Sequence, residues 1–138
     1  MTEPAPAPDV RVPVASDIDI VSARQQGRAL AMQLGFSSSD ATMVATAISE
    51  LARNIVLYAR RGEIILGAVV SSDHRGLAIT ACDNGDGIAD IRQALQDGYS
   101  TSGRMGVGLP GVKRLMDEFE ISSEQEKGTT ITMIKWGR

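Results

Sequence analysis

The stretch "CDNGDGIAD", residues 82–90, places three acidic residues among glycines directly after an apolar run. An EF-hand loop is one explanation, and it requires oxygen ligands at its first, third and fifth positions and a glutamate at its twelfth. Counted from Asp83, the third and fifth positions are Gly85 and Gly87, and the twelfth is Ala94. This spacing excludes an EF-hand calcium site. The acid at the end of the predicted strand therefore needs another role.

The length and composition predict one domain. The chain has 138 residues, 43% of them hydrophobic, which is enough for one sizeable core. Residues 1–9 are rich in proline and alanine and predict a disordered tail, so the domain is expected over 10–138. A net charge of −3 gives no concentrated basic surface, and we therefore expect neither a nucleic-acid nor a membrane partner.

The cellular compartment is predicted from what the sequence lacks. A single cysteine, Cys82, excludes an internal disulfide and cannot form a zinc site with the lone His74. The sequence has no apolar run of the roughly 20 residues that cross a bilayer, and it does not begin with a signal pattern. The chain is therefore expected to be cytoplasmic.

The hydrophobic pattern predicts helices followed by strands with helices between them, which suits a two-layer α+β sandwich. The predicted elements are a strand at 10–14, a helix from Ser16 to Gly35, a helix from 37 to about Tyr58, strands at 62–72 and 76–83 joined by the turn 73–76, a short helix at 90–97, a loop at 98–105, a helix at 108–119, and strands at 119–125 and 129–136. The apolar face of the second helix is assigned to Val44, Ala47, Ile48, Leu51, Ile55 and Tyr58.

The other face of the second helix carries Glu50, Arg53 and Asn54, which are three and four residues apart and project together. A solvated face is the ordinary explanation of such a group. Asparagine is a poor residue inside a helix, however, so Asn54 needs a reason for its place. Its carbonyl oxygen could ligate a hard cation such as magnesium, which is often held chiefly by phosphates.

A second glycine cluster, Gly103, Gly106, Gly108 and Gly111, precedes and opens the helix predicted at 108–119. Glycines ahead of a helix let backbone N–H groups approach phosphate oxygens, and the helix N-terminus favours negative charge. The cluster is not a Walker loop, because no Gly-Lys-Ser/Thr follows, and it comes too late in the chain for a Rossmann motif. A simple turn remains the alternative.

The order of these motifs resembles the nucleotide site of the GHKL ATPase superfamily. The motifs are the helix with Glu50 and Asn54, then "DNGDG" from Asp83, then "GVG" from Gly106, then "GTT" from Gly128. The resemblance covers nearly the whole chain after the tail and implies the two-layer Bergerat fold. The runs "SELARNIVLYA" and "STSGRMGVGLPGVKRLMDEFEI" are most similar to the stressosome switch kinases within this superfamily.

The resemblance implies ATP as the ligand and gives Asp83 a role. Its carboxylate would accept a hydrogen bond from the adenine amino group, while Gly85 and Gly87 let the main chain pass close to the base. Thr130 would support Asp83 from the adjoining strand, although an ordinary β-branched strand residue is the alternative.

The phosphate side of the site follows from the same resemblance. Asn54 would reach a magnesium ion, and Gly106 and Gly108 would offer N–H groups to the phosphates. The lid above them would comprise Ser100, Thr101, Ser102 and Arg104. These four could equally be solvent-facing loop residues.

Glu50 is the expected general base. Phosphoryl transfer needs mainly positioning and charge neutralisation from the protein, so one carboxylate aligned on the attacking hydroxyl is sufficient. Arg53 could steady phosphates or a partner, or could form a structural ion pair. The chain has no helical histidine to accept a phosphate, so the acceptor is expected on another protein.

The switch-kinase resemblance implies a serine/threonine kinase of partner switching. Its acceptors would be STAS-domain proteins of a stressosome, and after its release the chain would activate a PP2C-type phosphatase. Two alternatives remain open: a module of the anti-sigma-factor kind that sequesters a sigma factor, and a simple ATP hydrolase.

Overall fold

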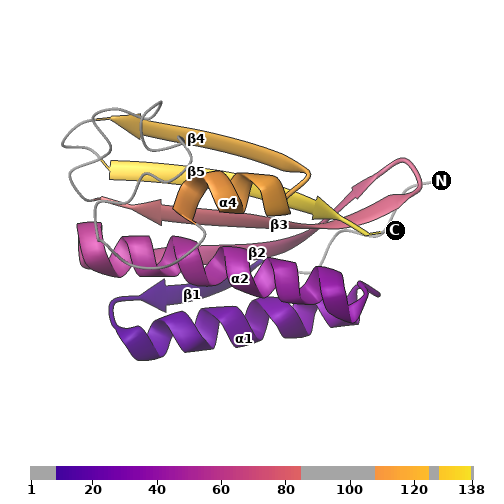
Figure 1. Cartoon of the computed structure of the whole chain (residues 1–138), viewed down its shortest axis with the longest axis horizontal. Helices are drawn as coiled ribbons and strands as arrows, with labels where there is room; N and C mark the ends of the chain where they lie inside the picture. The colour runs from indigo at the N-terminus through magenta and orange to yellow at the C-terminus, as the bar shows by residue number, and fades with distance from the viewer. Residues whose placement is uncertain (1–8, 85–107, 125–127, 138) are drawn as a thin grey trace.

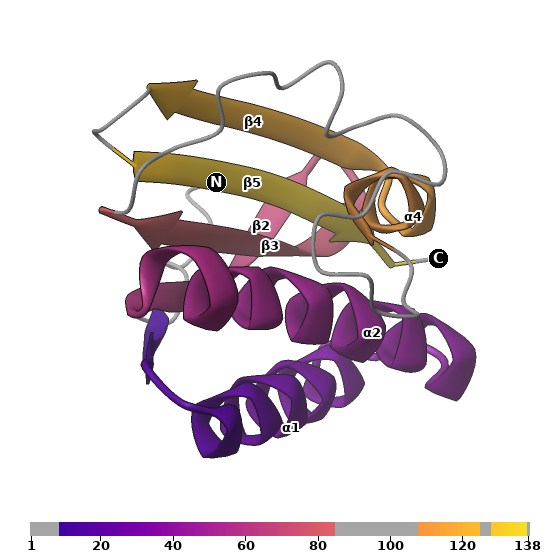
Figure 2. The same ribbon diagram turned by 60° about the vertical axis from the view of Figure 1, so that its left-hand side comes forward.

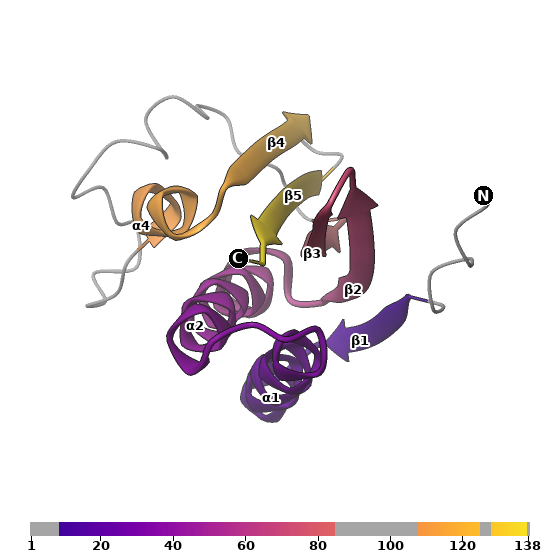
Figure 3. The ribbon, with the colours of Figure 1, turned by 90° about the vertical axis from the view of Figure 1, so that its right-hand side faces the viewer.

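A computed structural model describes residues 9–84, 108–124 and 128–137. It contains a five-stranded antiparallel sheet in the order β1-β2-β3-β5-β4, and the helices cover one face of it (Figures 1 and 3). The elements are β1 Val10–Val14, α1 Asp17–Gln33, α2 Ser38–Asn54, η1 Ile55–Ala59, β2 Gly62–Ser71, β3 His74–Asp83, α4 Gly108–Leu115, β4 Glu118–Glu124 and β5 Gly128–Trp136. The prediction of a two-layer α+β sandwich is confirmed. The predicted tail lies, except for Asp9, outside the described residues, as does the helix predicted at 90–97.

The strands β2 and β3 form the predicted hairpin, with Gly62 opposite Asp83 at one end and Ser71 opposite His74 at the other. The predicted turn at 73–76 is wrong in its bounds, because His74 already pairs within β3. Only Ser72 and Asp73 connect the strands, and Ser72 has a φ of 51°. Tight two-residue hairpin turns require such positive φ values.

The two faces of the sheet differ because side chains alternate along each strand. On β5, Thr129, Ile131 and Met133 are buried on the face that the helices cover, while Thr130 points to the other face and is exposed. The core lies between the two layers, and its largest fully buried side chains include Ile48, Leu51, Ile64, Leu66, Leu77, Ile79 and Met133. The opposite face of the sheet has no helix over it among the described residues (Figure 3).

The helices α1 and α2 lie side by side beneath the sheet (Figure 2). The α1 positions that are buried carry the small residues Ala23, Gly27 and Ala31. At the start of α2, the Ser37 side chain accepts a hydrogen bond from the Asp40 backbone N–H at 3.0 Å, so the predicted start of this helix at residue 37 is confirmed. None of the described helices has the length and apolar character needed to span a bilayer.

The second helix changes its geometry after Asn54. The segment η1 continues it to Ala59 as a π-helix, which has more residues per turn than an α-helix. Ile55 is buried as predicted, but Tyr58 is 49% exposed. The assignment of Tyr58 to the apolar face is therefore wrong, because the wider turn rotates the positions after Ile55 away from the α-helical phase.

The helix α4 ends at Leu115, earlier than the predicted 119. The chain then joins β5: the Asp117 backbone N–H donates to the Ile134 carbonyl at 3.0 Å, and the Asp117 carboxylate accepts the Trp136 backbone N–H at 2.7 Å. Lys135, only 5% exposed, donates to the Leu115 carbonyl at 2.9 Å. These contacts with β5 stop the helix where local sequence pattern would continue it.

Candidate functional site

The last residue of β3, Asp83, lies between two glycines on the neighbouring strands. A Cβ on Gly62 would lie 2.3 Å from the Cys82 carbonyl oxygen and 3.0 Å from the Asp83 Cβ. Gly128 has a φ of +107°, and a Cβ there would lie 2.1 Å from the Asp83 carbonyl oxygen. Only glycine therefore fits at either position without displacing the backbone around Asp83. Sequence reasoning missed Gly62.

The carboxylate of Asp83 is held by Thr129. The Thr129 backbone N–H donates to Asp83 Oδ1 at 3.3 Å, and the Thr129 hydroxyl lies 2.8 Å from that of Ser123 on β4. The expectation for Thr130 needs correction, because Thr130 is opposite Cys82 and exposed on the other face of the sheet. The buried positions Ile131 and Met133 could have identified Thr129, since every second residue of a strand shares a face.

The end of α2 also lies beside Gly62. Ile55 Cγ2 would lie 3.1 Å from a Cβ on Gly62, so the junction after Asn54 and the end of β3 meet around this glycine. Asn54 is half-buried, and its carboxamide makes no hydrogen bond to any residue that the structure describes. Its oxygen could serve as the cation ligand that the sequence predicted.

Glu50 lies one helical turn before Asn54 and forms an ion pair with Arg53. Arg53 Nη1 lies 2.7 Å from Glu50 Oε1, and the side chains are 32% and 12% exposed respectively. The structural ion pair considered for Arg53 therefore exists, and it involves the predicted general base.

Gly108 is the first residue of α4, with a φ of 62°, and α4 packs against α2. The structure thus places Gly108 on an element next to the helix of Glu50 and Asn54. The remaining predicted site residues lie outside the described residues: Gly85, Gly87, Ser100, Thr101, Ser102, Arg104 and Gly106.

The described residues fit a magnesium ion that is held mainly by phosphates. They contain no group of three or more His, Cys, Asp or Glu side chains that could form a protein cage for a metal. Magnesium usually keeps several waters and takes one or two protein oxygens together with substrate phosphates. The carboxamide of Asn54 suits that limited role.

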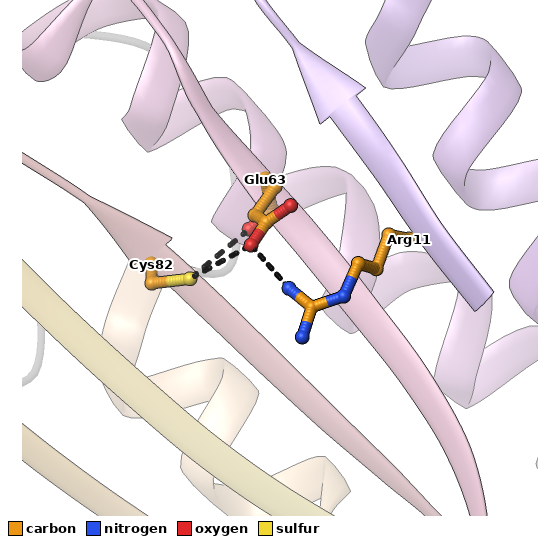
Figure 4. A network of polar contacts seen from close by, with 3 residues as sticks. All are labelled: Arg11, Glu63 and Cys82. Carbon is orange, nitrogen blue, oxygen red and sulfur yellow. Dashed lines mark hydrogen bonds and ion pairs between the residues drawn. The ribbon is translucent and has the colours of Figure 1, made fainter. Parts of the chain in front are cut away.

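Cys82, the residue before Asp83, lies on the opposite face of the sheet and has different neighbours. Figure 4 shows it beside Glu63, whose carboxylate Oε1 lies 3.9 Å from the sulfur and 2.7 Å from Arg11 Nη1. Burial raises the pKa of the Cys82 thiol, and the negative charge of Glu63 adds to this, while Arg11 acts in the opposite direction.

Comparisons with known proteins show the family of the chain. Residues 14–135 match the family described as "Histidine kinase-like ATPase domain". The serine/threonine-protein kinase RsbT of Bacillus subtilis is 54% identical over 127 residues, covering 92% of this chain and 96% of that protein. The anti-sigma F factor of Heyndrickxia coagulans is 32% identical over 120 residues, covering 82% of this chain and 81% of that protein.

A crystal structure of the RsbU and RsbW domains of a Mycobacterium tuberculosis protein shares the fold, with a TM-score of 0.66 at 23% identity. The match covers 97% of this chain but 34% of that one.

The chain therefore belongs to the histidine kinase-like ATPase family, the GHKL superfamily that its motifs predicted. Within that family it is an ATP-dependent serine/threonine-protein kinase, as the sequence predicted, since its identity to RsbT extends over almost the full length of both chains.

Proposed function

We propose that this kinase transfers the γ-phosphate of ATP to STAS-domain proteins of a stressosome, and that its release then activates a PP2C-type phosphatase. The observation that supports the proposal is that the end of α2, the helix that carries Glu50 and Asn54, meets the end of β3, which carries Asp83. Ile55 Cγ2, on the residue after Asn54, and the Asp83 Cβ lie 3.1 and 3.0 Å from the position that a Cβ would take on Gly62.

Asp83 would read the adenine end of the nucleotide. Its Oδ1 is oriented by the Thr129 N–H, and a carboxylate is acceptor-only, as recognition of an amino group requires. Asn54 and Gly108 would lie toward the phosphates, together with the predicted lid residues. A magnesium ion bound through Asn54 and the phosphates would neutralise their charge.

Glu50 would then align the acceptor hydroxyl. The hydroxyl proton passes to the Glu50 carboxylate, the hydroxyl oxygen bonds to the γ-phosphorus, and the bond to the β,γ-bridging oxygen breaks. ADP leaves with that electron pair. The Glu50 side chain is 12% exposed, and a side chain of a docked protein would have to reach its carboxylate there.

The partner assignment rests on two supports. The RsbT relative is named a serine/threonine-protein kinase, and the sequence runs around Glu50 and after Gly106 resemble the switch kinases. A cycle of this kind would take place in the cytoplasm, in keeping with the single-cysteine composition.

The test compares Glu50→Gln with the parent chain. The amide keeps the shape of the side chain but removes the base, so ATP binding should persist while single-turnover transfer to a STAS-domain protein falls by about 10²–10⁴. The variant should also remain bound to that partner when ATP is added, whereas the parent should be released. Undiminished transfer would exclude Glu50 as the base, and normal release without transfer would exclude the switch.

The anti-sigma F relatives favour a second candidate, a kinase whose main output is sequestration of a sigma factor. A pull-down with mass spectrometry separates the two. Recovery of STAS-domain proteins without a sigma factor supports the switch kinase, and recovery of a sigma factor supports the alternative.

A further inference from the structure

We propose that Arg53 is a positioning residue for the general base: it holds one oxygen of Glu50 so that the other faces the acceptor hydroxyl. This inference rests on the proposed function, in which Glu50 takes the proton.

The two side chains are arranged for this task by the helix. Glu50 and Arg53 are three residues apart in the last part of α2, so they share one side of the helix. Arg53 Nη1 donates to Glu50 Oε1 at 2.7 Å, the short distance expected of a charge-assisted hydrogen bond. Within the described residues, Arg53 is the hydrogen-bond partner that Glu50 has, and it contacts Oε1 alone.

A glutamate needs such a partner to act as an efficient base. Its side chain has several rotatable bonds, and fixing them costs conformational entropy. If that ordering had to occur during each transfer, the barrier would rise. An ion pair that already fixes the carboxylate in the free protein removes this cost, and a misplacement of about 1 Å can cost on the order of 100-fold in rate.

The exposures of the two residues support a role at a partly closed site. Glu50 is 12% exposed and Arg53 32%, so the pair is less screened by solvent than a surface ion pair. The guanidinium also keeps the donor capacity of its remaining N–H groups. If those groups bound the phosphates directly, Arg53 would instead be an ATP ligand, and this alternative makes different predictions.

The experiment is a set of variants at residues 50 and 53, measured with ATP and a purified STAS-domain acceptor. Arg53→Met removes the donor but keeps much of the aliphatic length, and Arg53→Lys keeps a charge that can still reach Glu50. We expect Arg53→Met to lower kcat by about 10–100-fold with an unchanged Kd for ATP, and Arg53→Lys to recover most of the loss.

The double variant Glu50→Gln, Arg53→Met tests whether Arg53 acts through Glu50. If it does, the double variant should be no slower than Glu50→Gln alone, because residues that act as a unit are not additive. Arg75→Met is the matched control, since Arg75 is exposed at the opposite end of β3 from Asp83. It should match the parent.

Three outcomes would overturn the inference while leaving the kinase assignment intact: an unchanged kcat for Arg53→Met, a weakened ATP affinity as its main effect, or a further loss in the Glu50→Gln background. Absence of transfer by the parent chain would instead contradict the proposed partner and mechanism. Circular dichroism and ATP binding by each variant show that a loss of rate is not a loss of fold.

Discussion

The backbone N–H of Thr129 on β5 donates to Oδ1 of Asp83 on β3, at 3.3 Å across the strand pair. In Asp83→Asn the amide oxygen would take the place of Oδ1, because only an oxygen can accept from that N–H. The NH2 group would then face the nucleotide and present a donor to the adenine amino group, itself a donor. We expect calorimetry to show loss of ATP binding with the fold retained.

Asp73→Asn is the control for this substitution, because Asp73 is exposed in the hairpin turn at the far end of β3. It should bind ATP as the parent does. If Asp83→Asn also bound normally, the adenine pocket would have to lie elsewhere.

Gly128→Ala should lower both stability and ATP affinity. Its φ of +107° is unfavourable for alanine, and the new Cβ would meet the Asp83 carbonyl oxygen at 2.1 Å. Gly35→Ala is a matched control, because Gly35 has a φ of +89° with nothing within 4 Å of the Cβ position. Backbone strain alone should cost Gly35→Ala about 1–2 kcal/mol in the free energy of unfolding.

Urea unfolding of the two glycine variants measures the difference. We expect the larger loss for Gly128→Ala, and a reduced ATP affinity for that variant only. Equal losses in the free energy of unfolding would mean that the strands around Asp83 move apart to accept the new Cβ at little cost. That result would contradict the close fit proposed between Gly128 and Asp83.

Asn54→Ala and Asn54→Asp should impair phosphoryl transfer at fixed magnesium concentration. The first removes the oxygen ligand, and the second adds a negative charge beside the phosphates. Transfer should fall by at least about 10-fold, the lower end of the cost of disturbing a metal environment. Radiolabel transfer over a range of magnesium concentrations tests this, with Lys113→Ala as the control, since Lys113 is exposed on α4. Identical rates for all three variants would remove α2 from the phosphate side of the site.

Cys82 should react slowly with alkylating reagents near pH 8. Its pKa is raised, so the thiolate fraction in the folded chain is smaller at this pH than for an ordinary cysteine. Glu63→Gln removes a charge that raises the pKa and should speed alkylation, whereas Arg11→Met removes the opposing charge and should slow it. Stopped-flow thiol titration gives both rates, and effects of the reverse sign would contradict the proposed charge balance.

The sequence predicted the elements well where local pattern and tertiary packing agree. The β2–β3 hairpin follows from β-branched runs, and the start of α2 follows from the serines at 37–39, as the Ser37 cap confirms. The end of α4 could not be predicted in this way. It depends on Asp117, which pairs with β5 residues that are distant in sequence.

The errors within the site have similar causes. Tyr58 was assigned with a period of 3.6 residues, but the π-helical turn after Asn54 breaks that period. Thr130 was expected beside Asp83, although strand alternation puts it on the face opposite to that of Ile131 and Met133, and the register of β5 against β3 places Thr129 opposite Asp83. Gly62 was missed because its role is to leave space, which no local pattern records.

The turn of the β2–β3 hairpin lies at the opposite end of β3 from Asp83. The ten residues of β3 separate the two ends by about 30 Å at the usual rise of a strand. This separation provides an attachment point for a fluorophore or a tether. A thiol introduced by Asp73→Cys would be exposed, whereas the native Cys82 has a raised pKa and should react more slowly. Brief labelling at moderate pH would then mark the turn selectively, and an immobilised chain would keep its nucleotide end directed into solution.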